Sequence, residues 1–112
     1  LEVEPMRTIE EFPGKIVICG GKFKMEHKRT ILRELPGIIF SPDGDRLKKM
    51  GLQGLNENDG VLWIIPGTTH SAHDKVKGQC QRNGAIFELS RTGGLSIINI
   101  IKENIINRKT TS

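Results

Sequence analysis

Hydrophobic residues along the chain fall into short apolar runs that are separated by longer stretches of mixed polarity. Four of these runs predict β-strands, at 16–19, 37–40, 61–65 and 85–89. The run Val61-Leu62-Trp63-Ile64-Ile65 is the most sharply bounded, because Asp59-Gly60 precedes it and Pro66-Gly67 follows it. Continuous apolar runs of this length are typical of strands that are buried on both faces of a parallel sheet.

The stretches between these runs predict helices at 24–35 and 71–83, with a shorter one at 45–53 and a last one from Gly93-Gly94 to about 107. In the helix at 71–83, Ser71 and Asp74 form an S-x-x-D capping pattern. Its apolar positions recur at Ala72, Val76 and Cys80, and Gly84 follows its end.

Strands that alternate with helices predict βαβ units and therefore an α/β fold. Because crossovers between parallel strands are right-handed, few topologies remain. We expect a Rossmann-like (flavodoxin-like) three-layer α/β/α domain with a mostly parallel four-stranded sheet in the order 2-1-3-4. This single domain is expected to span 15–107, with a linker or N-terminal arm at 1–14 and a tail at 108–112.

Charge is unevenly distributed along the 112 residues, whose formal net charge is +4. Residues 1–14 are acidic, and the remainder carries 16 basic and 9 acidic groups, a net charge of +7. Such a body attracts anions, which include nucleotides, nucleic acid and acidic proteins. Aromatic residues make up only 4% of the chain, which disfavours a stacking platform for single-stranded nucleic acid but leaves contact with a duplex backbone open.

No apolar run is long enough to cross a bilayer, and no secretory leader opens the sequence. The cysteines, Cys19 and Cys80, lie too far apart for a Cys-x-x-Cys zinc site and are too few for a disulfide scaffold. We therefore expect a cytoplasmic protein without a membrane partner. Because the chain begins at Leu1 rather than Met, we expect it to be a processed or excised piece.

Small polar residues follow the predicted strands, and ligands of open α/β sheets bind beyond the carboxyl ends of the strands. Ser41, Asp43 and Asp45 follow the second strand in an ordinary S-P-D-G turn context. The candidate ligand-binding residues follow the other three strands: Gly20, Gly21, Lys22, Thr68, Thr69, His70, Ser71, Arg91 and Thr92. Together they predict an anion pocket of glycines, hydroxyls and cationic side chains.

The glycines after the first strand match neither G-x-x-x-x-G-K-S/T nor G-x-G-x-x-G, and a tight turn explains them equally well. His70, at the expected start of a helix, is suited to contact an anion, to act as a general acid or base, or to bind a metal together with His73. No nucleophile motif is present, so no catalytic residue is predicted other than His70 if the protein is an enzyme. No metal site is predicted, and no cofactor is identified.

The strings KIVICGGKF and VLWIIPGTTHSAHDKVKGQCQRNGAIFEL resemble the bacterial and archaeal domain of unknown function 2325 family. The resemblance covers about residues 15–104. The matching residues are Gly20-Gly21, Thr69-His70, His73, Val76-Lys77, Cys80 and Gly84. Thr68-Thr69-His70 departs from the spelling of the loop that is most usual in that family. The resemblance implies a Rossmann-like α/β fold but no agreed activity.

These patterns favour a non-catalytic binding or regulatory module that takes a nucleotide-like or other anionic ligand at the strand ends. An enzyme of nucleotide or phosphate-ester chemistry that uses His70 is the main alternative. A nucleic-acid-binding domain and a haem- or metal-binding domain are the others.

A homodimer through the C-terminal helix is also expected. The apolar positions of that helix cover more than the one face that a sheet would bury, and Ile97 and Ile100 extend beyond it.

Overall fold

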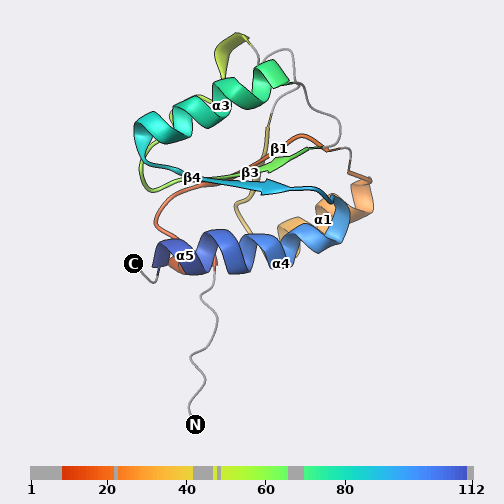
Figure 1. The fold of residues 1–112 in the computed structure, drawn as a ribbon. Coiled ribbons are helices and arrows are strands. Elements are labelled where there is room, and N and C mark those ends of the chain that lie inside the picture. The colour runs from red at the N-terminus through yellow and green to blue at the C-terminus, as the bar shows by residue number, and fades with distance from the viewer. Residues whose placement is uncertain (1–8, 22, 42–46, 48, 66–69, 111–112) are drawn as a thin grey trace.

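The computed structural model describes residues 9–21, 23–41, 47, 49–65 and 70–110. Four strands form one sheet: β1 (Ile16–Cys19), β2 (Ile39–Phe40), β3 (Gly60–Ile64) and β4 (Ile86–Ser90). Their order is β2-β1-β3-β4, and every neighbouring pair is parallel (Figure 1). The α/β class, the parallel sheet and the strand order expected from the sequence are therefore confirmed.

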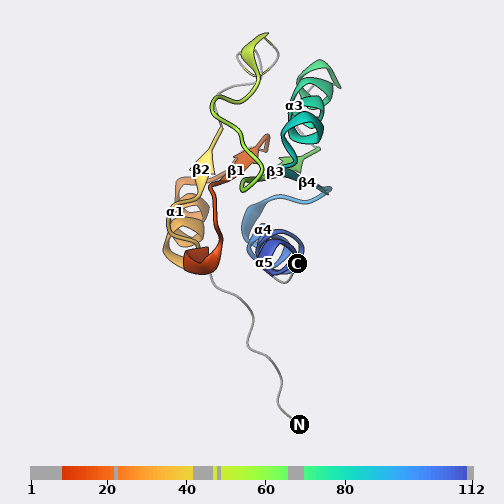
Figure 2. The same ribbon diagram turned by 90° about the vertical axis from the view of Figure 1, so that its left-hand side faces the viewer.

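Helices cover both faces of the sheet, as expected for a three-layer fold (Figure 2). One face carries α1 (Met25–Glu34) and the C-terminal helical run, and the other carries α3 (His70–Asn83). The C-terminal run consists of four consecutive pieces: η2 (Gly94–Ser96), α4 (Ile97–Ile101), η3 (Lys102–Ile106) and α5 (Asn107–Thr110). Of the helix expected at 45–53, residues 45, 46 and 48 lie outside the described part. Leu47, Lys49 and Met50 are helical, and the helix ends before Gly51, whose φ angle is 66°.

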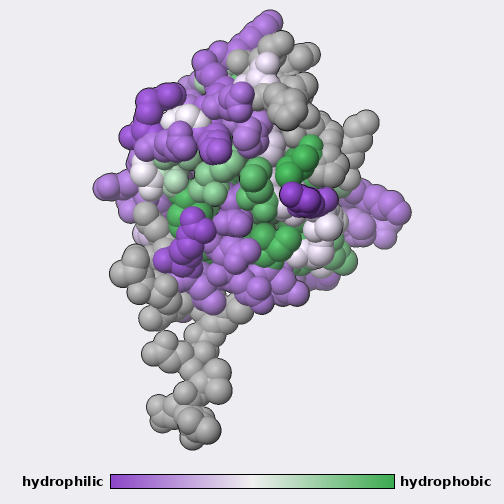
Figure 3. All heavy atoms as spheres, viewed as in Figure 1, coloured by the Kyte–Doolittle hydropathy of each residue, from purple (hydrophilic) through white to green (hydrophobic). Residues whose placement is uncertain are grey.

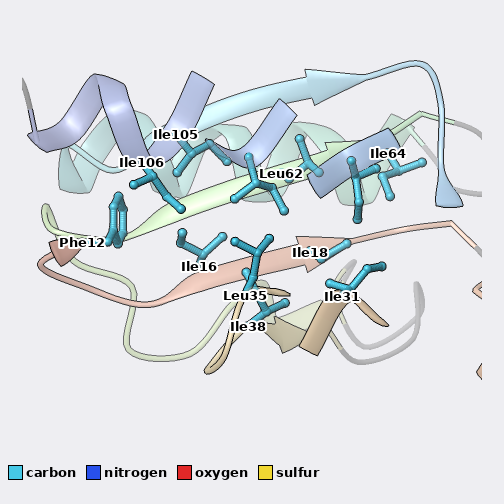
Figure 4. Close-up of a cluster of buried hydrophobic side chains, with 12 residues drawn as sticks. Phe12, Ile16, Ile18, Ile31, Leu35, Ile38, Leu62, Ile64, Ile105 and Ile106 are labelled. Carbon is cyan, nitrogen blue, oxygen red and sulfur yellow. The ribbon is translucent and has the colours of Figure 1, made fainter. Parts of the chain in front are cut away.

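Alternation along the strands divides the core into two clusters. Ile16 and Ile18 point toward α1 and α4, where they pack with buried residues from α1, β3 and the C-terminal helical run (Figure 4). Val17 and Cys19 point toward α3 and pack with Trp63 of β3. Since successive side chains of a strand alternate between faces, the fully buried β1 and β3 have to be apolar at every position.

The end of the segment 1–14 is part of this core. After η1 (Ile9–Glu11), the Phe12 side chain is only 6% exposed and packs in the cluster between β1 and the C-terminal run. Gly14 lies against the backbone of Asn58, where a Cβ atom has no room. The arm expected at 1–14 thus closes the amino-terminal end of the sheet with its last residues.

The C-terminal run differs from the expected helix in its geometry. Ile97 and Ile106 are nine residues apart, about two and a half turns of an α-helix, so they would lie on opposite sides. Both are nevertheless fully buried, because η3 is a π-helical turn that holds one residue more than an α-turn. The expectation that Ile97 extends beyond the buried face is therefore wrong. The homodimer through this helix was predicted because Ile97 was expected to be left uncovered, and the burial of Ile97 removes that reason.

None of the helices in the described ranges has the length and apolar character that a membrane span requires.

Candidate functional site

Two glycine-rich turns lie at the carboxyl ends of β1 and β4. β1 continues into Gly20 and Gly21, whose φ angles are 84° and 74°, and β4 continues into Gly93 and Gly94, the latter at φ 70°. Positive φ strains residues that carry a Cβ atom, so glycine suits these turns. Successive backbone N–H groups in some turns form concavities that bind anions.

The two turns lead into helices that start side by side on the same face of the sheet. His27 lies in the first turn of α1, and a Cβ atom on Gly94 would lie 3.8 Å from its Nδ1 atom. The start of η2 therefore contacts the start of α1. This contact places an imidazole beside the turn at Gly93-Gly94.

Hydroxyl groups organise the turn after β4. The buried Ser90 donates from Oγ to the Thr92 carbonyl oxygen at 2.6 Å and accepts from the Thr92 N–H at 3.2 Å. Thr92 Oγ1 lies 3.2 Å from Ser96 Oγ, which donates to the Gly93 carbonyl oxygen at 2.9 Å. These bonds hold Thr92 and Ser96 together at the start of η2.

Neither helix start is capped by a side chain. The residues at the two N-cap positions, Lys24 before α1 and Gly93 before η2, make no side-chain hydrogen bond to the helix. The first N–H groups of a helix lack partners within the helix, and they carry its partial positive charge. Two such starts in contact, next to turns that favour exposed N–H groups, form an arrangement suited to an anion.

Several of the predicted site residues belong to this edge. Gly20, Gly21 and Thr92 take part in the two turns, and Arg91 is exposed beside Thr92. Lys22, Thr68 and Thr69, like Asp43 and Asp45 after β2, lie outside the described residues. α3 begins at His70, whose side chain is also outside the described part.

Ser71 is exposed within the first turn of α3, so it does not occupy the capping position that the S-x-x-D pattern suggested. Asp74 instead lies 3.1 Å from Nδ1 of His73.

His27 and Ser96 were missed by sequence reasoning. His27 stands seven residues after Gly20, inside a helix whose polar face has no distinguishing pattern. Ser96 was hidden in the apolar start of the last helix, although G-G-x-S after a strand is a recognisable hydroxyl-bearing turn. Only the contact between the two helix starts indicates that these side chains belong together.

His73 lies on the other face of the sheet. Its ring makes edge contacts with Trp63 and Phe87, at centroid distances of 5.7 and 5.5 Å. Within the described ranges, no three His, Cys, Asp or Glu side chains are grouped so that they would hold a metal ion.

The two cysteines are buried thiols. Burial raises the pKa of Cys19 from 9.0 to about 12, which outweighs the lowering effect of its hydrogen bond with Ser41. Burial likewise raises the pKa of Cys80 to about 11, and the nearby Asp59 charge adds to this effect. The thiolate is the nucleophilic form of cysteine. These residues are therefore unsuited to nucleophilic catalysis at neutral pH.

An open pocket of about 570 Å³ lies apart from this edge, beside β2 on the face that carries α3. Its lining is largely apolar and includes Val17, Ile39 and Leu52, with Lys15 at one side. The Lys15 Nζ atom is already bound by Asp59 and by the Gly54 carbonyl oxygen. The pocket therefore offers apolar surface rather than a free cation.

Comparison with known proteins finds no matching family model, no matching curated protein and no matching solved structure.

Proposed function

We propose that this domain is a non-catalytic binding module for an anionic group, such as the phosphate of a nucleotide-like ligand. The site is the carboxyl edge of the sheet between the turns at Gly20-Gly21 and Gly93-Gly94. The observation that carries the proposal is the contact between the uncapped start of α1, which follows the turn at Gly20-Gly21, and the turn at Gly93-Gly94. Helix starts and glycine turns both present N–H donors to an anion.

Side chains at this edge suit the same ligand. Thr92 and Ser96 hold the turn in place through their hydroxyl groups, and the His27 imidazole beside it is a donor suited to an anion. The positive net charge of residues 15–112 favours the approach of an anion over a longer range. Nucleophilic catalysis by Cys19 or Cys80 is disfavoured because both thiols are buried and protonated.

Titration with inorganic phosphate, and separately with nucleoside monophosphates and diphosphates, tests this function. We expect saturable shifts of the Gly21 and Gly94 amide signals in NMR spectra. His27→Gln and Ser96→Ala should each weaken binding by about three- to tenfold, the value of one or two hydrogen bonds.

His73→Gln is the matched control, because His73 lies on the opposite face of the sheet and should leave the affinity unchanged. Absence of saturable shifts with every probe, or equal effects of the two histidine variants, would contradict the proposal. Release of inorganic phosphate from the nucleotides would favour the enzymatic alternative instead.

A further inference from the structure

Within the part of the chain that the structure describes, β4 lies at one edge of the sheet. Among the described residues it pairs only with β3. The Ile86 N–H donates to the Asp59 carbonyl oxygen, and the Ser90 carbonyl oxygen accepts from the Ile65 N–H. Since backbone groups of a parallel strand alternate in direction, those of Phe87 and Leu89 point away from β3. This edge therefore presents two residues whose N–H and C=O groups are placed to pair with another strand.

The surface around this edge is apolar. Leu89 is 45% exposed, and Ile65 and Leu95 are each 44% exposed. Figure 3, seen from the side on which β4 runs across the front of Figure 1, shows green apolar surface across the middle of the molecule. Proteins usually protect sheet edges with lysine, proline, bulges or a covering segment. The only charge within β4, Glu88, lies on the opposite side of the strand from Leu89 and is bound by Arg108 at 3.0 Å.

We propose that a second copy of this chain pairs with β4 in antiparallel fashion, so that two four-stranded sheets join into one. A two-fold axis perpendicular to the sheet relates antiparallel strands, and residues opposite each other then share a face. Centring the axis on Glu88 would set two carboxylates opposite each other, which is unfavourable. Centring it on Leu89 sets Leu89 against Leu89 and Glu88 against Ser90.

Charge complementarity supports the register centred on Leu89. In this register Arg91 of the second copy lies opposite Phe87, on the face that carries α3. The Phe87 ring contacts His73, which is bound to the Asp74 carboxylate. Each guanidinium thus approaches an aromatic ring and an acidic group, and the two-fold axis forms this contact twice. One pair of five-residue strands is a small interface, so we expect dissociation in the micromolar range.

Sedimentation velocity over a micromolar concentration series tests the pairing. We expect a reversible dimer that Leu89→Lys weakens by about tenfold or more, because it places a cation on the paired edge. Met25→Lys is the matched control: Met25 is 64% exposed on α1, away from β4, and the variant should dimerise normally. Thermal unfolding of both variants shows whether the fold is retained.

Charge reversal tests the register. Arg91→Asp and Asp74→Arg should each weaken the dimer by about fivefold, and the double variant should recover most of the loss. In oxidising buffer, Leu89→Cys should form a disulfide dimer, since a hydrogen-bonded antiparallel pair places the Cα atoms about 5.5 Å apart. Cys19 and Cys80 are buried and should not compete, and Met25→Cys is the control.

A monomer at every concentration would overturn the proposal and leave the edge to a strand from a different protein. A dimer that is equally stable in Leu89→Lys and Met25→Lys would also overturn it, because association would then use another surface.

Discussion

At the scale of single residues, Asp59 is a buried acidic residue whose carboxylate is stabilised by several hydrogen bonds. Asp59 is only 1% exposed, and its carboxylate accepts from the Lys15 N–H at 2.9 Å, the Lys15 Nζ at 2.6 Å and the Asn56 N–H at 2.8 Å. Burial by itself would raise the pKa of Asp59, but the bonds from Lys15 and Asn56 together hold it below its ordinary value. These bonds tie the residue before β1 to the turn before β3, and so align the starts of the two central strands.

Stability should therefore depend on Asp59 in acid. A group whose pKa is lower in the folded state contributes stability above its unfolded pKa of about 3.9 and loses it as the pH falls through the folded value. We expect Asp59→Asn to lower the free energy of unfolding by about 1–3 kcal/mol at neutral pH and to flatten its decline below about pH 5. Denaturant unfolding at several pH values measures both effects. Glu103→Gln, at an exposed carboxylate of η3, should retain the wild-type decline.

The two buried thiols should make the stability of the fold depend on pH under alkaline conditions. Their pKa values rise to about 12 for Cys19 and about 11 for Cys80 in the folded protein. The unfolded chain releases these protons at a lower pH than the folded protein does. The stability that is present below about pH 8.5 should therefore fall as the pH rises from there toward the folded pKa values. A thiol reagent should react slowly with the native protein at pH 8 and rapidly in denaturant. Fast modification of the native protein would show that the thiols are accessible.

At the scale of elements, one π-helical turn in the C-terminal run changes which apolar residues face the sheet. The sequence placed Ile97, Ile101, Ile105 and Ile106 on more than one side of a regular helix. The π-helical turn at Lys102–Ile106 brings all four onto the sheet. The packing is close: a Cβ atom on Gly60 would lie 2.6 Å from the Cγ2 atom of Ile105. Burial of four isoleucines outweighs the poorer hydrogen-bond geometry of the wider turn.

Truncation to alanine should destabilise the protein much more at the buried Ile97 than at the exposed Leu95. Ile97→Ala is expected to cost about 2–5 kcal/mol of stability, because it leaves a cavity against the sheet. Leu95→Ala, at a side chain 44% exposed, should change stability by only about 0.5 kcal/mol. Chemical unfolding measures both values. A similar cost for the two variants would contradict the burial described for Ile97.

Deletions test the π turn itself. Removing the exposed Glu103 should convert the turn into an α-turn and keep Ile105 and Ile106 on the sheet, so the protein should remain folded. Removing both Glu103 and Asn104 should rotate the two isoleucines away by a further residue and cost several times more stability. Circular dichroism and unfolding curves compare the two deletions. Equal losses would indicate that chain length, rather than helix register, decides the outcome.

At the scale of the whole molecule, the strand order places β1 and β3 in the centre and leaves β2 and β4 at the edges. Every residue of β1 and β3 is buried, so their amides should exchange most slowly with solvent. The Phe87 and Leu89 amides should exchange rapidly in dilute protein and become protected as the concentration rises. Hydrogen exchange at low and high concentration checks this expectation. Protection of these amides in the dilute monomer would show that the edge is covered within one chain.

Much of this architecture was predictable from the pattern of apolar residues alone. The continuous run at 16–19 matched β1 residue for residue, and β3 and α3 each began within a residue of the expected position. These elements were predictable because strand and helix periods act over a few residues, and right-handed crossovers then restrict the order of the strands. The glycine turns of the candidate site followed from the same rule, since ligands bind beyond the carboxyl ends of parallel strands.

Contacts between distant segments were decided only by the tertiary structure. His27 lies near Gly94, 67 residues away in the sequence, because α1 and η2 start on the same face of the sheet. Likewise, Ile97 and Ile106 are both buried because the π-helical turn brings them onto the same side of the C-terminal run. The β4 edge is apolar because Leu89 lies within β4 and Ile65 follows the neighbouring strand β3. The pattern of apolar residues along a short segment indicates which face of a helix or strand is apolar. Which surface meets that face depends on packing energies summed over the whole chain.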